Sequence, residues 1–459
     1  MLLTILIVFF LSFTDKAEET VPALSERAQA LREQYQIPID ELDYPVSADY
    51  LDSLQRIGAN VLYTSRWMNG ASIRIAEQDT AQILPQLRAC DFINNILLTR
   101  VQLPSGASPR KRRYTDTIAD YGEAQAQLQH YNLPALHRLG FRGQGVHIAV
   151  IDGGFQHADT LSCFANRIIG AYDMTDDTDD FYGQTGRHGT LCLSTMAANM
   201  PGYVGAATEA KYVLIRSEEE ATESLKETYN LIASLELADS LGVQICSVSL
   251  GYNIFDDTTT SFTHAMMDGR STDVSRAATI AARKGLLICV AAGNEGNKDW
   301  HHITAPADAD SILAVGAVGL DSTIADFSSR GYEGRAIKPE VCAVGYKAQF
   351  VDASLQIGTG SGTSFACPLI AGLAACLWSA YPQESAIQIR ERIIRSAHQY
   401  DTPDYYYGYG IPDALKAYLQ VSPLDIPTSE PQLTIPRKVL RDGRLFILRN
   451  GYTYDVLGR

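Results

Sequence analysis

The sequence predicts an α/β protein in which a parallel sheet is flanked by helices on both faces and is preceded by a small α+β domain. From about Gly145, short and continuously apolar runs alternate with segments of helical periodicity. Continuous apolar strands are typical of a parallel sheet that is buried on both faces, and their alternation with helices is typical of βαβ units. The 459 residues suffice for one large core plus smaller units.

The elements of the large domain follow one another in a regular order. The expected strands are VHIAVID (146–152), KYVLIR (211–216), VQICSVSLG (243–251), LLICVAAGN (286–294) and ILAVGAV (312–318). The expected helices are ESLKETYNLIASLELADSLG (223–242), VSRAATIAARKG (274–285) and CPLIAGLAACLWSAY (367–381). In sheets of this kind the chemistry lies at the carboxyl ends of the strands.

The chain opens with the apolar run MLLTILIVFFLSF, followed by polar TDKAEET. The run is too short to span a bilayer comfortably and predicts a signal peptide over residues 1–20. An uncleaved N-terminal anchor is the alternative, because no Lys or Arg precedes the run and no A-x-A site follows it.

The small α+β unit is expected over about residues 46–103. A capped helix leads into a strand in SADYLDSLQRIGANVLY, and an Asn-Gly turn introduces a second strand in WMNGASIRIA. QDTAQILPQLRAC then predicts a second helix and NNILLTRVQL a third strand. The segment PSGASPRKRRYTD that follows is expected to be an exposed linker, and its basic run is either a solvated tether or a cleavage site.

The C-terminal region has a different composition. From about residue 421 a proline-spaced linker, VSPLDIPTSEPQLTIPRK, leads to GRLFILRNGYTYDVLGR. The second segment predicts a β-hairpin that turns at Asn450-Gly451.

Charge and cysteine content narrow the function classes. A formal net charge of -15 argues against nucleic-acid binding. The acidic clusters DMTDDTDD (173–180) and SEEEATE (217–223) are expected to be solvated loops, with cation binding as the alternative. The eight cysteines are irregularly spaced and lie mostly in apolar stretches, which favours buried thiols over disulfides.

The segment GTGSGTSFACPLIAGLAA (358–375) joins a Gly/Ser/Thr-rich loop to a helix. Unpaired N–H groups at a helix start attract an anion, which is either a bound phosphate or a charge that forms during a reaction. A phosphate loop of the Walker type has the pattern G-x-x-x-x-G-K-[ST], with a Lys near the start of the helix. Here Gly362-Thr363-Ser364 is followed by Phe365 and no Lys is present, which argues against a phosphate loop. Without the rest of the chain, the simpler interpretation of Ser364 is that it caps the N-terminus of the helix and has no further role.

Three further polar residues lie at element ends. Asp152 ends the strand AVID, His188 begins the helix GRHGTLCLSTMAA, and Asn294 follows the strand VAAG. Asp, His and Ser at such positions are the parts of a nucleophilic triad, in which His188 takes the Ser364 proton and Asp152 orients the imidazole. The Asn294 amide and the Ser364 backbone N–H would bind the oxyanion.

The local sequences VIDGGF, HGT, AAGNEG and GTSFACP, in that order, resemble those of the subtilisin-like serine proteases, the subtilases, over roughly residues 120–420. GYGIPDALKA is similar to the closing helix of that domain, and residues 46–103 resemble the inhibitory propeptide. The sequence departs from the family at Gly153, where Thr or Ser is common, and it lacks a recognisable strong calcium loop. The C-terminal hairpin is similar to sorting tails of exported Bacteroidetes-type proteins.

The resemblance implies an exported serine endopeptidase that is made as a propeptide-inhibited zymogen and needs no cofactor for its chemistry; structural calcium stays unassigned. The implied organisation is 1–20 signal or anchor, 21–113 propeptide and linker, 114–420 catalytic domain and 421–459 tail. The implied location is secreted or in the cell envelope of a bacterium, with membrane contact only through the N-terminal segment or C-terminal sorting. The implied partners are protein or peptide substrates and the chain's own propeptide.

The resemblance also implies where substrate binds. Its backbone would lie beside Ser249, Leu250 and Gly251 and beside Ala291, Ala292 and Gly293, with Glu295 at the rim of the P1 pocket. Glu295 has an alternative as a solvated surface acid. His301 and His302 are expected to be loop residues and His157 a structural one.

Two other functions compete with the protease. A catalytically silent subtilase could act as a binding scaffold, and only the geometry of the four catalytic positions can decide against it. A dinucleotide-binding enzyme could use GQGVHIAVIDGG, but these glycines do not form G-x-G-x-x-G after a strand.

Overall fold

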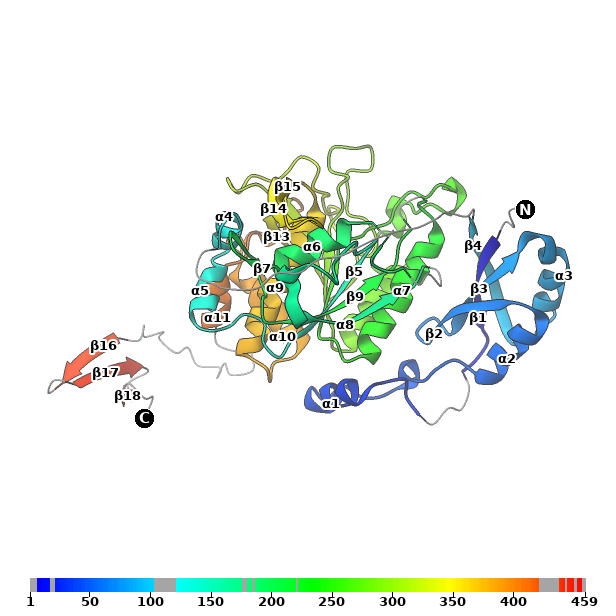
Figure 1. The fold of residues 1–459 in the computed structure, drawn as a ribbon, viewed down its shortest axis with the longest axis horizontal. Coiled ribbons are helices and arrows are strands. Elements are labelled where there is room, and N and C mark those ends of the chain that lie inside the picture. The colour runs from blue at the N-terminus through cyan, green and yellow to red at the C-terminus, as the bar shows by residue number, and fades with distance from the viewer. Residues whose placement is uncertain are drawn as a thin grey trace. The chain divides into compact units, whose positions relative to one another are not determined.

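The structure is a computed structural model that describes residues 6–16, 21–102, 121–175, 180–183, 186–219 and 222–420, and the backbone of strands between 437 and 455. The chain forms two compact units, Met1–Leu419 and Gln420–Arg459. Within the first unit, Figure 1 shows a large α/β domain and a smaller N-terminal domain.

A seven-stranded sheet forms the centre of the large domain, with strand order β13-β12-β11-β10-β5-β9-β6. All neighbouring strands pair in parallel. The strands are β5 (His147–Asp152), β6 (Ile168–Asp173), β9 (Lys211–Arg216), β10 (Ile245–Val248), β11 (Leu287–Ala291), β12 (Leu313–Val318) and β13 (Val341–Val344). The predicted fold class is therefore confirmed, and the structure adds β6 and β13 to the expected strands.

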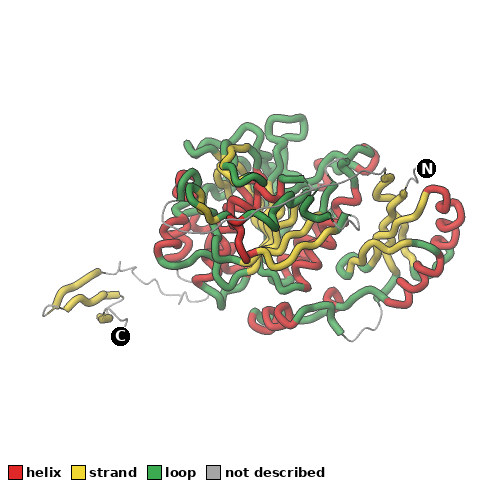
Figure 2. Tube along the Cα trace, viewed as in Figure 1, coloured by secondary structure: helices red, strands yellow, loops and turns green. Residues whose placement is uncertain are grey.

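Helices cover both faces of this sheet (Figure 2). One core contains Ile148 and Val150 of β5 together with α6 (His188–Ala197), α9 (Thr363–Ala380) and α10 (Ala386–Ser396). The other contains the alternate residues Ala149 and Ile151 together with α7 (Leu225–Ser240) and α8 (Asp273–Arg283). Because successive residues point to opposite faces and both faces are buried, the strand sequence is continuously apolar.

Helix α9 is long and apolar enough to cross a membrane, and no other helix of the described residues is. Most of it, 89%, is buried inside the protein. Its composition therefore reflects a position in the core of the large domain.

The smaller domain is built on a four-stranded antiparallel sheet of order β2-β3-β1-β4. Its strands are β1 (Leu6–Phe13), β2 (Asn60–Ser65), β3 (Gly70–Ala76) and β4 (Ile93–Gln102), and its helices are α2 (Ala48–Ile57) and α3 (Glu77–Arg88).

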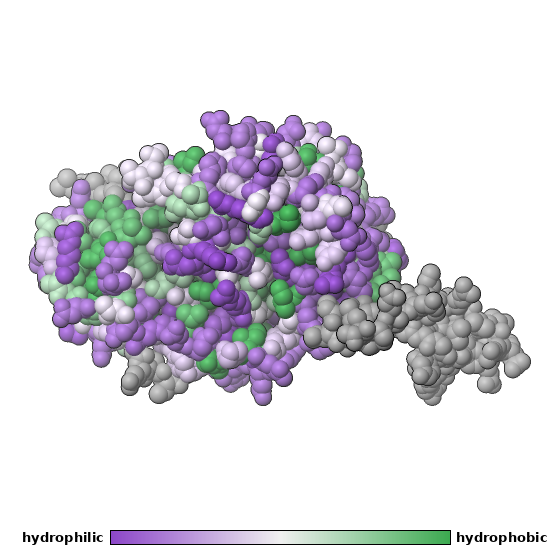
Figure 3. Space-filling view, turned by 180° about the vertical axis from the view of Figure 1, so that it is seen from behind, coloured by the Kyte–Doolittle hydropathy of each residue, from purple (hydrophilic) through white to green (hydrophobic). Residues whose placement is uncertain are grey.

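Hydrophilic residues cover much of the molecule in the view of Figure 3, interrupted by hydrophobic patches.

The expectation of a signal peptide or anchor is wrong for Leu6–Phe13. This segment is β1, a central strand that pairs with β3 and β4. Leu11 and Phe13 lie in the core of the small domain, whereas Phe10 stacks on Tyr229 of α7 with 4.2 Å between ring centroids. The strand is apolar except for Ser12 because both of its faces are covered, and a short run of this kind has the composition of a signal sequence.

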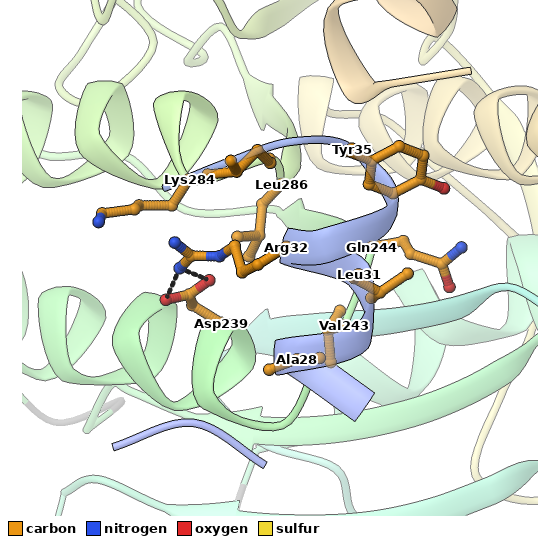
Figure 4. Close-up of a pocket in the computed structure, with 12 residues that line it drawn as sticks. Ala28, Leu31, Arg32, Tyr35, Asp239, Val243, Gln244, Lys284 and Leu286 are labelled. Atoms are coloured by element: carbon orange, nitrogen blue, oxygen red, sulfur yellow. Dashed lines mark hydrogen bonds and ion pairs between the residues drawn. The ribbon is translucent and has the colours of Figure 1, made fainter. Parts of the chain in front are cut away.

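The folded N-terminal region also extends beyond the expected residues 46–103. Helix α1 (Glu26–Gln34) and the 3-10 helix η1 (Glu41–Asp43) pack against the large domain. In Figure 4, Arg32 points from α1 to Asp239 of α7, and its Nη2 lies 2.8 Å from both carboxylate oxygens. Lys284 Nζ lies 2.6 Å from Asp43 Oδ2 of the same segment.

The second unit contains a three-stranded antiparallel sheet of β16 (Arg437–Arg441), β17 (Arg444–Arg449) and β18 (Tyr452–Asp455). Strands β17 and β18 flank Asn450-Gly451, with Arg449 opposite Tyr452, where the sequence predicts the turn. Strand β16 adds a further partner, of which the sequence analysis assigned only the first two residues, Arg437 and Lys438, to the linker.

All eight cysteines are free, and seven of them are buried. This confirms the expectation of buried thiols. The remaining elements are α4 (Gln125–Gln129), α5 (Leu133–Arg138), α11 (Ala414–Leu419), β7 (Asn199–Met200), β8 (Tyr203–Val204), β14 (Ala348–Val351), β15 (Ile357–Gly360), η2 (Ser162–Arg167), η3 (Thr258–Thr260) and η4 (His264–Met266).

Candidate active site

Asp152 is the last residue of β5 and is fully buried. Its Oδ1 accepts hydrogen bonds from the backbone N–H of Gly153 and lies 2.8 Å from His188 Nδ1. Oδ2 is buried and has no hydrogen-bond partner among the described residues. The carboxylate is therefore directed toward the imidazole.

His188 is the first residue of α6, and Gly189 lets this helix start approach β5. A Cβ at Gly189 would lie 2.6 Å from the carbonyl oxygen of Gly154 and 2.8 Å from Asp152 Cβ. Neither contact is tolerable, so a larger residue would push the helix and its histidine away from Asp152. The glycine of the HGT motif thus has a packing role.

The charge of Asp152 controls the titration of the imidazole. Attraction by Asp152 is the largest influence on His188 and raises its pKa well above the usual value. The 2.8 Å contact between Asp152 Oδ1 and His188 Nδ1 fixes the tautomer, so that Nε2 of the neutral ring is the free proton acceptor. This is the arrangement that a general base requires.

Ser364 is the second residue of α9 and is 7% exposed. Its carbonyl oxygen accepts hydrogen bonds from Ser249 Oγ at 3.0 Å and from Cys192 Sγ at 3.2 Å. No hydrogen bond joins Ser364 Oγ to His188 among the described residues. In free enzymes such bonds are often long and tighten only when substrate is bound.

Cys192 lies beneath the histidine, a position that the sequence analysis did not single out. Its Sγ is 3.8 Å from both ring nitrogens of His188 and donates to the Ser364 carbonyl. Burial raises the pKa of the thiol, which therefore stays protonated and acts as a weak donor. The i, i+4 spacing of Cys192 after His188 on one helix is the sequence signal that could have identified it.

The Asn294 side chain is oriented by Thr363, another residue that the sequence analysis did not assign. Asn294 Oδ1 accepts from the backbone N–H of Thr363 at 2.9 Å and from its hydroxyl at 3.1 Å. Because the oxygen is committed, the amide nitrogen is available as a donor. A Cβ at Gly362 would lie 2.8 Å from Ser364 Oγ and 3.7 Å from Asn294 Nδ2, so glycine keeps the space between these two atoms open.

The two segments expected to bind substrate differ in their free backbone groups. Leu250 and Gly251 form no backbone hydrogen bond with other described residues. In contrast, Ala292 donates to Val315 and accepts from Thr304. Residues 249–251 can therefore form backbone hydrogen bonds with an extended peptide. Both backbone groups of Ala292 are already paired, so this residue can contribute only van der Waals contact.

Thr304 lies between these two segments and was not identified from the sequence. Its hydroxyl is buried without a partner among the described residues, 2.2 Å from a Cβ placed on Gly251 and 2.9 Å from one placed on Gly293. Glu295, the expected rim residue, is instead ion-paired with Lys298 at 2.7 Å. A basic P1 side chain would have to displace Lys298 from this carboxylate.

The remaining histidines take no part in this arrangement. His301 Nδ1 lies 3.1 Å from the Gly296 carbonyl and His302 Nδ1 3.0 Å from the Gly331 carbonyl, both in loops. His157 lies in a turn with a positive φ of 60°.

One group of described residues has ligand atoms close enough to hold a metal ion, namely Asp152, His188 and Cys192. A protonated thiol and a histidine bonded to its carboxylate do not suit a metal. Of the two acidic clusters expected to be solvated loops, DMTDDTDD lies partly outside the described residues, whereas in SEEEATE the expectation is wrong for Glu219, which is ion-paired with Arg100 and Lys226.

Two carboxylates of α7, Glu236 and Asp239, bind the small domain. Glu236 accepts from Ser65 Oγ at 2.6 Å and from the backbone N–H groups of Arg66 and Trp67 at 2.8 and 3.2 Å. Arg66 also forms an ion pair with Asp239 at 2.6 Å. The contacts hold the turn between β2 and β3 against the catalytic domain.

Comparison with known proteins identifies the family of this chain. The model of the subtilase family matches residues 143–410, and that of the peptidase S8 propeptide domain of Bacteroidota matches residues 8–115. The chain therefore belongs to the subtilase family of serine peptidases and carries its propeptide domain. The second match begins within β1, in agreement with the placement of that strand in the small domain.

Its relatives include subtilisin DY of Bacillus licheniformis, which is 30% identical over 298 residues covering 62% of this chain and 97% of that protein. Subtilisin E of Bacillus subtilis (strain 168) is 31% identical over 281 residues, covering 61% and 67%. The crystal structure of MycP1 from Mycobacterium smegmatis aligns with a TM-score of 0.54 at 21% identity, covering 72% of this chain and 92% of that one. The last similarity establishes the fold alone.

Proposed function

We propose that the protein is an exported serine endopeptidase, made as a zymogen that its own propeptide inhibits. The observation that carries the proposal is the 2.8 Å contact between Asp152 Oδ1 and His188 Nδ1, with Ser364 at the start of α9 and the Asn294 amide free to donate. Membership in the subtilase family supports the same assignment.

In the proposed mechanism, His188 Nε2 removes the proton of Ser364 as Oγ attacks the peptide carbonyl carbon. Asp152 stabilises the imidazolium that forms. The Asn294 amide and the Ser364 backbone N–H donate to the oxyanion, with the positive end of α9 behind them. His188 then protonates the leaving amine. In the second half of the reaction, His188 takes a proton from water, which attacks the acyl-enzyme, and returns the proton to Ser364 Oγ as the ester bond breaks. No step requires a cofactor.

Substrates are proteins or peptides that bind in an extended conformation. Leu250 and Gly251 offer unpaired backbone groups for such a strand, which supports recognition through the main chain. Thr304 closes the floor between Gly251 and Gly293, so we propose that it limits the size of the P1 side chain. Glu295 can favour a basic P1 residue only if Lys298 is displaced.

Export to the cell envelope or beyond rests on relatives. They include the minor extracellular protease Epr of Bacillus subtilis (strain 168), which is 28% identical over 301 residues. The apolar N-terminal run no longer supports export, because Leu6–Phe13 is a strand of the propeptide domain. Fractionation of the native host with an antibody against residues 121–420 would test the location.

Labelling with a fluorophosphonate tests the catalytic assignment. The matured wild-type enzyme should react at Ser364, whereas Ser364→Ala and His188→Ala should not. A folded, matured wild type that does not react would contradict the proposal. It would then favour a silent binding scaffold, the alternative that the missing Ser364–His188 hydrogen bond leaves open.

A further inference from the structure

A group of carboxylates lies beside the proposed triad, and we call it the acidic recess. It consists of Glu218 and Glu219, which follow β9, Glu223 before α7, and Asp256 in the loop after β10. Glu218 Oε2 lies 3.8 Å from the Cβ position of Gly153, next to Asp152. The Glu223 N–H donates to Asp256 Oδ2 at 3.1 Å, which joins the two loops.

The recess contains a guanidinium group from the propeptide domain. Arg100 of β4 forms an ion pair with Glu219, and its side chain is 6% exposed. Its Nε has no hydrogen-bond partner among the described residues. The recess thus holds one arginine side chain out of solvent, and this arginine belongs to the segment whose removal produces the mature enzyme.

The cavity beside Arg100 has a volume and lining residues that suit a long basic side chain. A cavity of about 200 Å³ is lined by residues that include Leu98, Arg100, Glu223, Phe255, Asp256 and Thr260. Phe255 and Leu225 provide apolar surface for methylene groups, and Glu223, Asp256 and Asp257 supply the carboxylates of its lining. Lysine and arginine bind in this way, with the stem on apolar groups and the charged end on acids.

Arg100 is one of two cations that pair with Glu219 in the recess. Lys226 is buried and binds Glu219 Oε1 at 2.8 Å, so Glu219 is shared between Lys226 and Arg100. Although burial opposes its charge, these two cations keep the pKa of Glu219 below its usual value. Burial and the neighbouring Glu227, Glu223 and Asp152 raise the pKa of Glu218 well above normal. Loss of Arg100 would leave Glu219 with Lys226 alone, and another cationic side chain could then take the place of Arg100.

We propose that the acidic recess is a substrate subsite for a lysine or arginine side chain on the N-terminal side of the scissile bond, and that Arg100 occupies it in the precursor. The proposal rests on the proposed peptidase function and names its substrate class. Arg100 precedes the expected cut between about Leu103 and Tyr114 in the sequence, so the recess holds a residue from the N-terminal side of that bond. The linker itself offers Arg110-Lys111-Arg112-Arg113.

Paired peptides that differ only in charge test the subsite in the matured wild-type enzyme. Arginine and its neutral isostere citrulline are placed in turn at P2, P3 and P4, and fluorophosphonate titration gives the concentration of active sites. We expect kcat/KM to favour arginine at one of these positions by on the order of 10- to 100-fold, as for a charge-assisted hydrogen bond. The preference should weaken with added salt.

Variants assign the preference to the recess. Glu219→Gln and Asp256→Asn should reduce the arginine preference, while Glu333→Gln, an exposed acid in another loop, should leave it unchanged. Asp256 is exposed, so its variant serves if Glu219→Gln fails to fold. Equal hydrolysis of both peptides by fully labelled wild type, or a preference that both recess variants retain, would overturn the subsite alone. Absence of labelling would overturn the proposed function and the subsite with it.

Discussion

At the residue scale, neighbours with no chemical role of their own orient the reactive groups. Thr363 holds the Asn294 oxygen and thereby presents its amide nitrogen, and Cys192 lies against both His188 and the Ser364 carbonyl. Thr363 lies in the family motif GTSFACP and Cys192 comes two residues after HGT, but the sequence does not show what either residue contacts. Their roles follow from distances alone.

Replacing Asn294 tests the oxyanion assignment. Asn294→Asp keeps the oxygen that accepts from Thr363 but removes the amide donor, so the fold should survive. We expect kcat to fall by about 10² to 10³, the loss seen when the corresponding donor is removed from subtilisin, with little change in KM. Asn294→Ala should give a similar loss. A KM effect with unchanged kcat would contradict the assignment.

The pH dependence of kcat/KM tests the pairing of His188 with Asp152. Because the pKa of His188 is raised, the base is protonated and inactive at low pH, and activity should rise with pH through a value above about 6.5. Asp152→Asn should move this limb to lower pH and reduce the plateau by about 10⁴-fold. His157→Gln is the control and should leave the limb in place. A wild-type limb at or below 6.5 would contradict the pairing.

The same pair affects stability in the opposite direction. A histidine whose folded pKa is raised stabilises the fold fully below its unfolded pKa, and this contribution is lost as pH rises through the folded pKa. The pair therefore stabilises the fold least at the pH where the base is active.

At the element scale, β1 and α1 decide how the propeptide domain is built and bound. β1 supplies two of the three pairings in the small sheet, and α1 adds a contact with the large domain in which its Arg32 shares Asp239 with Arg66 of the β2–β3 turn. Neither element was expected from the sequence.

An acidic substitution in β1 distinguishes a strand of the propeptide domain from a leader peptide. Leu11→Asp would place a charge at a fully buried position, and we expect no folded precursor when the chain is expressed without export. Leu2→Asp, in the same apolar run but outside the described residues, is the control. Circular dichroism and limited proteolysis give the result. Equal, normal folding of both variants would support a leader instead.

Breaking the α1 contact should loosen the propeptide. Arg32→Met leaves Asp239 with Arg66 alone in a buried position, which we expect to cost about 3 kcal/mol. In a Ser364→Ala background, thermolysin should then remove the N-terminal region faster. Arg56→Met, an exposed arginine on α2, is the control. Identical cleavage rates would mean that α1 contributes nothing to docking.

At the scale of the whole molecule, the fold of the large domain explains why a propeptide is useful. Its sheet joins β5 to β10, and β9 to β6, across long stretches of chain. Such non-local parallel pairing folds slowly because distant segments must meet first. The propeptide domain packs on α7, beside this sheet, and can hold it during folding.

Processing of the precursor tests the link between propeptide and activity. If the enzyme cuts itself between about Leu103 and Tyr114, Ser364→Ala should accumulate uncleaved while wild type gives a shorter chain. The run Arg110–Arg113 also permits cleavage by another, basic-specific protease. Expression in the native host and in a foreign one, with N-terminal sequencing, decides. A mature terminus on the variant in the native host would exclude obligatory self-processing, and full activity of the intact precursor would exclude inhibition.

The sequence by itself determined the parallel α/β class and the positions of Asp152, His188, Asn294 and Ser364 at element ends, because periodicity and local motifs are properties of short segments. The tertiary structure alone decided that the apolar N-terminal run is β1, since burial by α7 and by the small core comes from residues distant in sequence. It also decided the contact of Arg100 with Glu219 and the roles of Thr363, Thr304 and Cys192. These depend on segments brought together only by folding, which no local pattern encodes.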